Sequence, residues 1–308
     1  MRPLALALVF LLALPSGLAA GPDVVASIAP VHSLVARVMQ GADQGENAPR
    51  LLLSPGASPH DHALRPSDAA ALESAALVFW VGPRLERWLE RPLATLATGA
   101  RVVRLADLPG LTRLPLRDGA AFEALDHAHD HGAGPDNGGT DPHLWLDPEN
   151  AKLWLDAIAA ALAGADPARQ TLYLANAAAA RAELEALAAA IKARLAPFRG
   201  RPFVVFHDSI HYFEHRFGIE AAGAVAPGDA RAPGPARLAR IRERIRAVGA
   251  VCLFREPQFR SALVATVAEG TGAHVALLDP LGASLRPGPD LYRELLRGLA
   301  DSLAGCLG

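Results

Sequence analysis

A long stretch free of helix breakers, Pro167 to Leu195, constrains the fold of this chain most strongly. It is rich in Ala, Leu, Glu and Arg, and it contains no Gly and no Pro after its first residue. Residues of these types have high helix propensity, so we expect one continuous helix here. At 1.5 Å per residue, roughly 28 residues span about 40 Å, the length of a whole lobe. Such a helix forms a stiff strut rather than a flexible hinge.

Short apolar or β-branched segments alternate with helical patterns on both sides of this stretch. The segments before it are Val24–Ile28, Arg50–Leu53, Leu77–Val81 and Val102–Leu105, and those after it are Pro202–Phe206, Ile219–Val225, Val251–Phe254 and His274–Leu278. The helical patterns include His32–Gln40, Ser67–Ser74, Arg84–Leu96, Pro235–Val248 and Gln258–Glu269. Alternation of this kind is typical of parallel sheets with helices on their faces. We therefore predict an α/β fold of two lobes, each with a small parallel sheet flanked by helices, joined by one long rigid helix.

The first 20 residues have the pattern of a secretory signal peptide. A basic start at Arg2 precedes an apolar run from Leu4 to Leu14, and small residues surround a cut after Ala20. The apolar run is too short to form a membrane-spanning helix. We therefore expect a soluble protein outside the cytoplasm, with an N-terminal lobe at 21–166, a linking helix at 167–197 and a C-terminal lobe at 198–308.

Charge and cysteine content narrow the function further. The formal net charge is −2, which is too small to argue for nucleic acid or an acidic membrane surface as a partner. Cys252 and Cys306 predict one disulfide in an oxidising compartment, where closing a loop of this size stabilises the fold by about 4 kcal/mol. A pair of zinc ligands is the weaker alternative, because neither cysteine has a CxxC neighbour.

Several residues that can bind a metal ion follow predicted strands. They are His60, His207 and Asp279, and His143 stands just after the glycine-rich segment 118–140. In open α/β sheets ligands bind at the carboxyl ends of the strands, so we expect two side chains from each lobe to face one cleft. Three imidazoles and one carboxylate suit Zn²⁺ in tetrahedral geometry. A cap or turn role is the simpler alternative for each residue alone, and only their recurrence at strand ends favours a metal site.

The segment 118–140 also carries histidines, at His127, His129 and His131. We expect this polar, glycine-rich segment to be a flexible surface loop of the first lobe. Its histidine tract is either an accessory metal site or a polar linker, and composition favours neither.

The remaining histidines have simpler expected roles. His211 and His215 share the spacing of one helix face with His207, but we expect both to be solvated, because His207 precedes the cap of that helix. We expect His32 to be buried and hydrogen-bonded, and His274 to be structural. Whether His32, His62, His211 or His215 touches metal stays open at this level.

Several motifs together resemble one known family. They are Gly56–His62, Leu64–Asp68, Asp141–Pro148, Phe206–Asp208, Phe254–Phe259 and Leu278–Gly282. In this order they resemble the substrate-binding proteins of metal ABC importers, specifically the zinc-specific (ZnuA-type) members, over nearly the whole mature chain. The resemblance implies two lobes joined by a rigid helix with the metal between them. It carries over His60, His143, His207 and Asp279 as the ligand positions.

The resemblance also implies a function and a metal. It implies high-affinity zinc capture in the periplasm and delivery to an inner-membrane ABC permease and its ATPase, by a protein that we expect to be a monomer and not an enzyme. Manganese and iron relatives usually have a glutamate where this chain has His207, and imidazole favours Zn²⁺. Zinc-type relatives also have a C-terminal disulfide, matching Cys252 and Cys306, and a His-rich insertion, which is short here.

Three alternatives stay open at this level. One is a manganese- or iron-binding relative of the same family, and another is a cell-surface adhesin of the same fold. The third is a zinc-dependent periplasmic hydrolase, in which three protein ligands and a water hold the ion. The chain has no HExxH and no other nucleophile signature to support hydrolysis. No GxGxxG follows the first predicted strand, which disfavours a nucleotide-binding enzyme.

Overall fold

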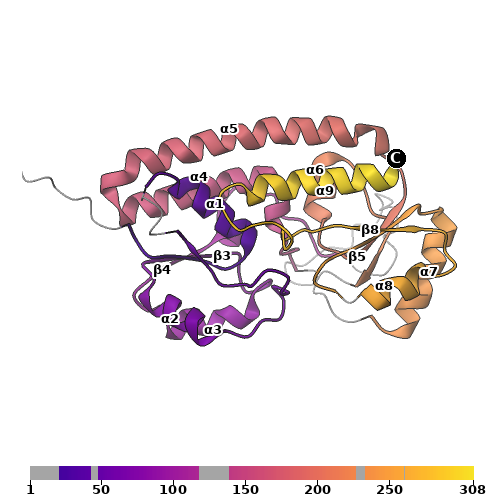
Figure 1. Cartoon of the computed structure of the whole chain (residues 1–308), viewed down its shortest axis with the longest axis horizontal. Coiled ribbons are helices and arrows are strands. Elements are labelled where there is room, and N and C mark those ends of the chain that lie inside the picture. The colour runs from indigo at the N-terminus through magenta and orange to yellow at the C-terminus, as the bar shows by residue number, and fades with distance from the viewer. Residues whose placement is uncertain (1–20, 43–47, 118–138, 227–232, 260) are drawn as a thin grey trace, which may run out of the picture.

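The computed structural model describes residues 21–42, 48–117, 139–226, 233–259 and 261–308 (Figure 1). The predicted signal peptide and the tract His127–His131 lie outside these residues. The described chain contains two four-stranded sheets, with strand orders β2-β1-β3-β4 and β6-β5-β7-β8, and every strand pair is parallel. The two sheets therefore share one topology, and the predicted fold class of two α/β lobes is confirmed.

The first sheet and its helices come from the N-terminal half of the chain. The strands are β1 (Val24–Ala26), β2 (Arg50–Leu51), β3 (Leu77–Trp80) and β4 (Arg101–Arg104). The helices are α1 (Ala29–Met39), α2 (Pro66–Ser74), α3 (Arg87–Thr95) and α4 (Pro148–Ala165), with short 3₁₀ turns η1 (Leu105–Asp107) and η2 (Leu144–Leu146).

The second sheet repeats the pattern after the long helix. The strands are β5 (Phe203–His207), β6 (Ala224–Ala226), β7 (Cys252–Arg255) and β8 (His274–Leu277), and the helices are α6 (His211–Phe217), α7 (Pro235–Val248), α8 (Ser261–Ala268) and α9 (Leu291–Leu307). The predicted strand Ile219–Val225 was placed too early. Gly218 adopts a left-handed φ of +70°, and the backbone N–H of Ile219 donates to the Glu214 carbonyl, so this stretch ends α6 before the strand begins.

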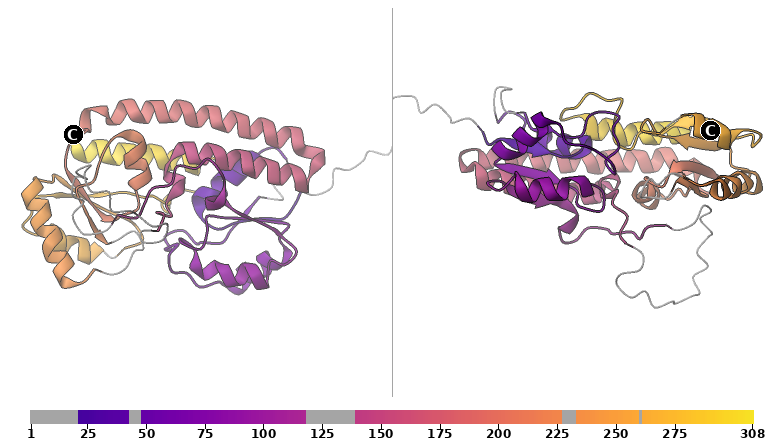
Figure 2. Two further views of the ribbon diagram at one scale, coloured as in Figure 1. Left: turned by 180° about the vertical axis from the view of Figure 1, so that it is seen from behind. Right: turned by 90° about the horizontal axis from the view of Figure 1, so that it is seen from below.

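The long helix α5 (Gln170–Leu195) follows a 3₁₀ turn, η3 (Pro167–Arg169), and is followed by another, η4 (Ala196–Phe198). Figures 1 and 2 show α5 running along both lobes on one side of the molecule, with α2, α3, α7 and α8 on the other. Its buried residues recur every three or four positions: Tyr173, Ala177, Ala180, Leu184, Leu187, Ile191 and Leu195. This stripe packs against α1, α4 and α9. The helix is therefore a spine in contact with both lobes, and not only a connection between them.

Alternate residues of each strand enter two different cores. On β5, Phe203 and Val205 join one large buried cluster that extends through both lobes, whereas Val204 and Phe206 join a smaller cluster under α7 and α8. On β3, Phe79 points to the large cluster and its neighbours to a small cluster under α2 and α3. Because the large core is shared, the lobe boundaries at 166 and 197 stay a prediction.

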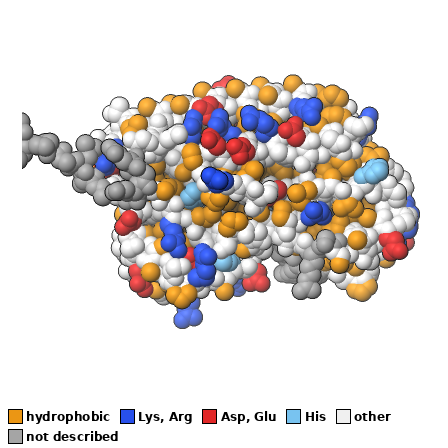
Figure 3. Space-filling view, in the orientation of Figure 1, with side chains coloured by type: hydrophobic (Ala, Val, Ile, Leu, Met, Phe, Trp, Pro, Cys, Tyr) orange, Lys and Arg blue, Asp and Glu red, His pale blue; other side chains and the backbone are white. Residues whose placement is uncertain are grey.

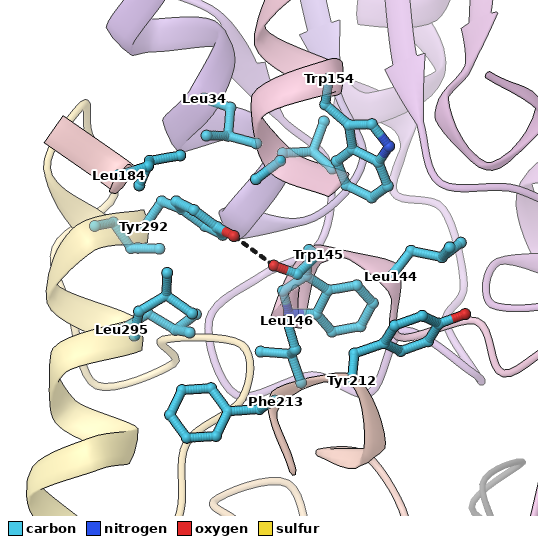
Figure 4. Packing of buried hydrophobic residues seen from close by; sticks show 14 of the residues in the cluster. Leu34, Leu144, Trp145, Leu146, Trp154, Leu184, Tyr212, Phe213, Tyr292 and Leu295 are labelled. Atoms are coloured by element: carbon cyan, nitrogen blue, oxygen red, sulfur yellow. Dashed lines mark hydrogen bonds between the residues drawn. The ribbon is translucent and has the colours of Figure 1, made fainter. Parts of the chain in front are cut away.

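The middle of the shared core joins the two lobes directly. Figure 4 shows Trp145 and Leu146 of the first lobe among Phe213 and Leu295 of the second, and the Tyr292 hydroxyl donates to the Trp145 carbonyl. The Trp145 indole N–H donates to the carbonyl of Pro280 at 2.7 Å. Buried contacts of this kind resist separation of the lobes as rigid bodies.

Among the described residues, none of the helices has the length and apolarity needed to cross a bilayer. On the face shown in Figure 3, acidic and basic side chains are interspersed between apolar ones. This mixed surface agrees with the small net charge of the chain.

Candidate metal centre

Three of the four predicted ligands converge between the sheets. His60, His143 and His207 each place one ring nitrogen within 4.8 Å of a ring nitrogen of the other two. Their ring centroids are 5.4 Å (His60–His143), 5.3 Å (His60–His207) and 5.0 Å (His143–His207) apart. Zinc bonds of 2.0–2.1 Å in tetrahedral geometry place ligand nitrogens about 3.3 Å from one another. Small rotations of the rings therefore suffice to bring all three onto one ion.

His60 lies on the irregular segment after β2. Its backbone N–H donates to Ser58 Oγ at 3.3 Å, and the indole N–H of Trp88 in α3 donates to the carbonyl of Pro59 at 2.9 Å. The Trp88 ring also packs on His62, with ring centroids 4.8 Å apart. A segment without regular structure is thus fixed to a helix at the residue before the ligand.

His143 precedes η2 and is only 2% exposed. Asp141 Oδ1 accepts hydrogen bonds from its backbone N–H at 2.9 Å and from its Nδ1 at 2.7 Å. Burial disfavours the charged carboxylate, but His143 and these hydrogen bonds hold the pKa of Asp141 well below its ordinary value. A carboxylate at Nδ1 keeps the proton there and leaves Nε2 as the ligand atom. Nε2 of His143 is buried, without a hydrogen-bond partner in the described part of the chain.

His207 is the last residue of β5 and is 3% exposed. Its Nδ1 lies 3.4 Å from Oε1 of Glu256, and Ser209 Oγ donates to the same oxygen at 2.8 Å. Sequence reasoning assigned no role to Glu256. The only signal available was that Glu256 belongs to the motif Phe254–Phe259, which supported the family resemblance.

His60 is suited to bind a cation because its ring is held neutral. Burial, followed by the nearby rings of His143 and His207, lowers the pKa of His60 to about 2. A neutral imidazole keeps a lone pair for a metal ion. The cavity between the rings has a volume of about 10 Å³ and is also lined by Trp145 and Gln258. It therefore suits a single ion rather than an organic substrate.

Asp279, the fourth predicted ligand, does not belong to this cluster of ligand atoms in the described residues. Its Oδ1 accepts from the backbone N–H of Ala283 at 2.9 Å, and its Oδ2 accepts from the N–H and the hydroxyl of Ser284 at 3.0 and 2.8 Å. Gly282, with a φ of +67°, allows the tight turn that these bonds close. The predicted position after a strand is correct, but the carboxylate caps a turn and is absent from the cluster of candidate ligand atoms in the described chain.

The other described histidines lie outside the cluster of three. His32 is buried and its Nε2 lies 2.8 Å from the Pro49 carbonyl, as predicted, and burial lowers its pKa. His215 and His274 are exposed. His211 was expected to be solvated, but it is half-buried, with Nδ1 3.6 Å from Oδ2 of Asp141. The second oxygen of that carboxylate thus faces a further imidazole.

Buried polar bonds join the lobes beside the site. Arg117 of the first lobe pairs with Asp208, the residue after His207, and with Glu214 at 2.6 Å. The Tyr212 hydroxyl donates to the Asp141 carbonyl at 3.0 Å. These contacts hold the ligand-bearing segments of the two lobes in a fixed relation.

The predicted disulfide between Cys252 and Cys306 is confirmed. It ties the first residue of β7 to the last turn of α9. Cys252 pairs with Phe203, the first residue of β5, whereas His207 is the last residue of that strand. The bridge therefore fastens the fold at the end of the sheet away from the histidine cluster.

Comparison with known proteins gives consistent matches. The family of periplasmic zinc-uptake complex component A proteins (ZnuA) matches residues 24–306. The high-affinity zinc uptake system protein ZnuA of Brucella abortus (strain 2308) is 43% identical, covering 92% of this chain and 91% of that protein. The protein of the same name from Paracoccus denitrificans (strain Pd 1222) is 42% identical, covering 93% and 92%.

Solved structures agree with these matches. A crystal structure of ZnuA has a TM-score of 0.76 at 26% identity and covers 94% of this chain and 100% of that chain. A zinc-bound 138–173 deletion mutant of ZnuA has a TM-score of 0.76 at 25% identity and covers 94% and 99%.

Proposed function

Because the chain belongs to the ZnuA family of periplasmic zinc-uptake components, we propose that it captures Zn²⁺ in the periplasm and delivers it to an ABC importer in the inner membrane. His60, His143 and His207 are the protein ligands in this proposal. One observation carries it: three imidazoles, from segments far apart in the chain, place ring nitrogens within 4.8 Å of one another. Uncharged imidazoles do not repel one another, whereas three imidazolium ions would.

The donor set supports zinc over manganese or iron. The candidate ligand atoms of the described residues are all ring nitrogens, and the nearby carboxylates of Asp141 and Glu256 face Nδ1 atoms of two of the rings. Nitrogen donors favour Zn²⁺, whereas Mn²⁺ favours sites rich in oxygen donors. A carboxylate behind an imidazole also raises its basicity and fixes its orientation.

Capture and release of the ion depend on the irregular segment that carries His60. His143 and His207 are buried, whereas His60 is partly exposed and lies on an irregular segment. The shared core and α5 resist opening of the lobes, so the ion enters and leaves through movement of the His60 segment. Contact with the permease provides that movement in delivery.

The proposal includes export and carriage without catalysis. Residues 1–20 direct export, the protein acts as a monomer, and the permease and its ATPase are its partners. In this proposal the tract His127–His131 is an accessory zinc-binding segment. Carriage predicts that the protein releases one zinc ion in each delivery. It also predicts that the protein does not hydrolyse an ester.

Zinc binding tests the function directly. The mature protein should compete for Zn²⁺ with a high-affinity chelator, and the combined His60→Ala, His143→Ala and His207→Ala variant should lose this ability. His215→Ala is the matched control, because His215 is exposed. Retention of wild-type affinity by the triple variant would reject the site, and failure of the wild type to bind zinc would reject the function.

A further inference from the structure

The turn Glu256–Phe259 forms one wall of the metal centre. The backbone N–H of Phe259 donates to the Glu256 carbonyl at 3.3 Å and closes the turn. Glu256 faces Nδ1 of His207 at 3.4 Å, and the Phe259 ring lies against the His207 ring, with centroids 5.4 Å apart. The residues at both ends of the turn therefore hold the same ligand histidine.

Gln258, within this turn, is the unexplained polar group of the site. It lines the cavity together with His60, His143 and His207. Both Oε1 and Nε2 of its side chain are buried, and neither has a hydrogen-bond partner within the described residues. A buried amide without partners is destabilising and is rare in native proteins. The amide of Gln258 at this position therefore indicates a bound ligand that completes the hydrogen bonds of the amide.

The three histidines leave one position on a tetrahedral zinc ion to be filled. The expected fourth ligand, Asp279, has both carboxylate oxygens engaged by the Ala283–Ser284 turn. Pro59 also lines the cavity, but its side chain has no atom that could bind a metal ion. Apart from the three histidines, Gln258 is thus the polar side chain of the cavity wall that has no other partner in the described chain.

We infer that Gln258 recognises the ligand in the fourth coordination position of the bound ion, by accepting a hydrogen bond from a metal-bound water through Oε1. The inference rests on the proposed zinc-binding function and adds a specificity-determining residue to it. A bound water is a stronger hydrogen-bond donor than bulk water, because the ion withdraws charge from it. The amide is neutral, so it orients this water without adding the negative charge that would favour harder ions.

Two substitutions test this role. Gln258→Leu keeps the approximate size and removes the polar atoms, and Gln258→Glu replaces the amide with an isosteric carboxylate. Gln170→Leu, at an exposed position in the first turn of α5, is the matched control. For each variant, zinc affinity is measured by chelator competition, the visible spectrum of the Co²⁺ form reports the donor set, and the melting temperature is measured with and without zinc.

We expect Gln258→Leu to bind zinc about 10-fold to 100-fold more weakly, the range typical of residues that orient a metal site. Its Co²⁺ spectrum should change, and its melting temperature without metal should equal or exceed that of the wild type, because an unsatisfied amide is removed. Gln258→Glu should raise Mn²⁺ affinity relative to zinc. The control should match the wild type in all three measurements.

Two results would overturn the inference. One is wild-type zinc affinity and an unchanged Co²⁺ spectrum in both Gln258 variants. The other is a loss of affinity in Gln258→Leu accompanied by a lower melting temperature of the metal-free protein, which would assign a purely structural role. Both differ from failure of the proposed function, in which the wild type itself would not bind zinc.

Discussion

Asp141→Asn tests how the protein orients its ligands. The wild-type carboxylate accepts from the backbone N–H of His143 at 2.9 Å and from its Nδ1 at 2.7 Å, and it is 1% exposed. An asparagine that turns its NH₂ group toward the ring makes Nδ1 the acceptor. The proton then moves to Nε2 and blocks the atom that should bind zinc.

The expected magnitude follows from these contacts. A buried hydrogen bond to a charged group contributes about 1.5–3 kcal/mol, and each 1.4 kcal/mol is a factor of ten in affinity. Zinc binding by Asp141→Asn should therefore weaken about 10-fold to 100-fold. Glu256→Gln provides the comparison within the same site, and it should cost less, because Glu256 lies 3.4 Å from His207 Nδ1 and also accepts from Ser209.

Chelator competition at neutral pH measures both variants, and circular dichroism of the metal-free proteins shows whether each is folded. The reasoning is refuted if Asp141→Asn, still folded, binds zinc as tightly as the wild type. It is also refuted if Glu256→Gln loses more affinity than Asp141→Asn.

Three further substitutions test single interactions in the fold. Burial raises the pKa of Glu86 from 4.5 to about 7, so ionising this side chain lowers the stability of the fold by about 3 kcal/mol, a penalty that is absent below pH 4.5 and complete above pH 7. Glu86→Gln should therefore raise the melting temperature at pH 8 and not at pH 4, and an equal gain at both pH values would contradict this cause. Trp88→Phe removes the hydrogen bond to the Pro59 carbonyl, worth about 1 kcal/mol, and should speed zinc dissociation about fivefold in stopped-flow measurements. Trp80→Phe is the control and should leave the rate unchanged, because Nε1 of Trp80 has no hydrogen-bond partner in the described chain. Cys252→Ser removes a disulfide between residues separated by 54 positions and should lower the free energy of unfolding, measured in urea, by about 4 kcal/mol while leaving zinc affinity unchanged. A large loss of zinc affinity would contradict this and show that the disulfide supports the site.

The sequence was sufficient to predict the architecture because each element has a local signal. The breaker-free stretch before Leu195 predicted α5, and alternating apolar segments predicted the two parallel sheets. What it could not show was the shared core. The residues on one face of each sheet pack against α1, α4, α5 and α9 together, and periodicity alone does not say which partner an apolar face meets.

The candidate site was predicted in part for a similar reason. The strand-end argument predicted that His60 and His207 would lie close together, because topology brings the carboxyl ends of parallel strands to one edge, and their ring nitrogens do lie within 4.8 Å of each other. For Asp279 the position was right, but whether its carboxylate faces the ion or the Ser284 backbone depends on the turn that follows. Glu256 and Gln258 were missed because a turn residue gains a role only through contacts with residues distant in the sequence.

The most direct test of the central claim is the position of zinc itself. Anomalous diffraction at the zinc edge from crystals of the zinc-loaded protein locates the ion without reference to any structural model. The account predicts one strong peak with ring nitrogens of His60, His143 and His207 at 2.0–2.1 Å. A principal peak at any other group of side chains, or one that contacts fewer than three of these rings, would contradict it.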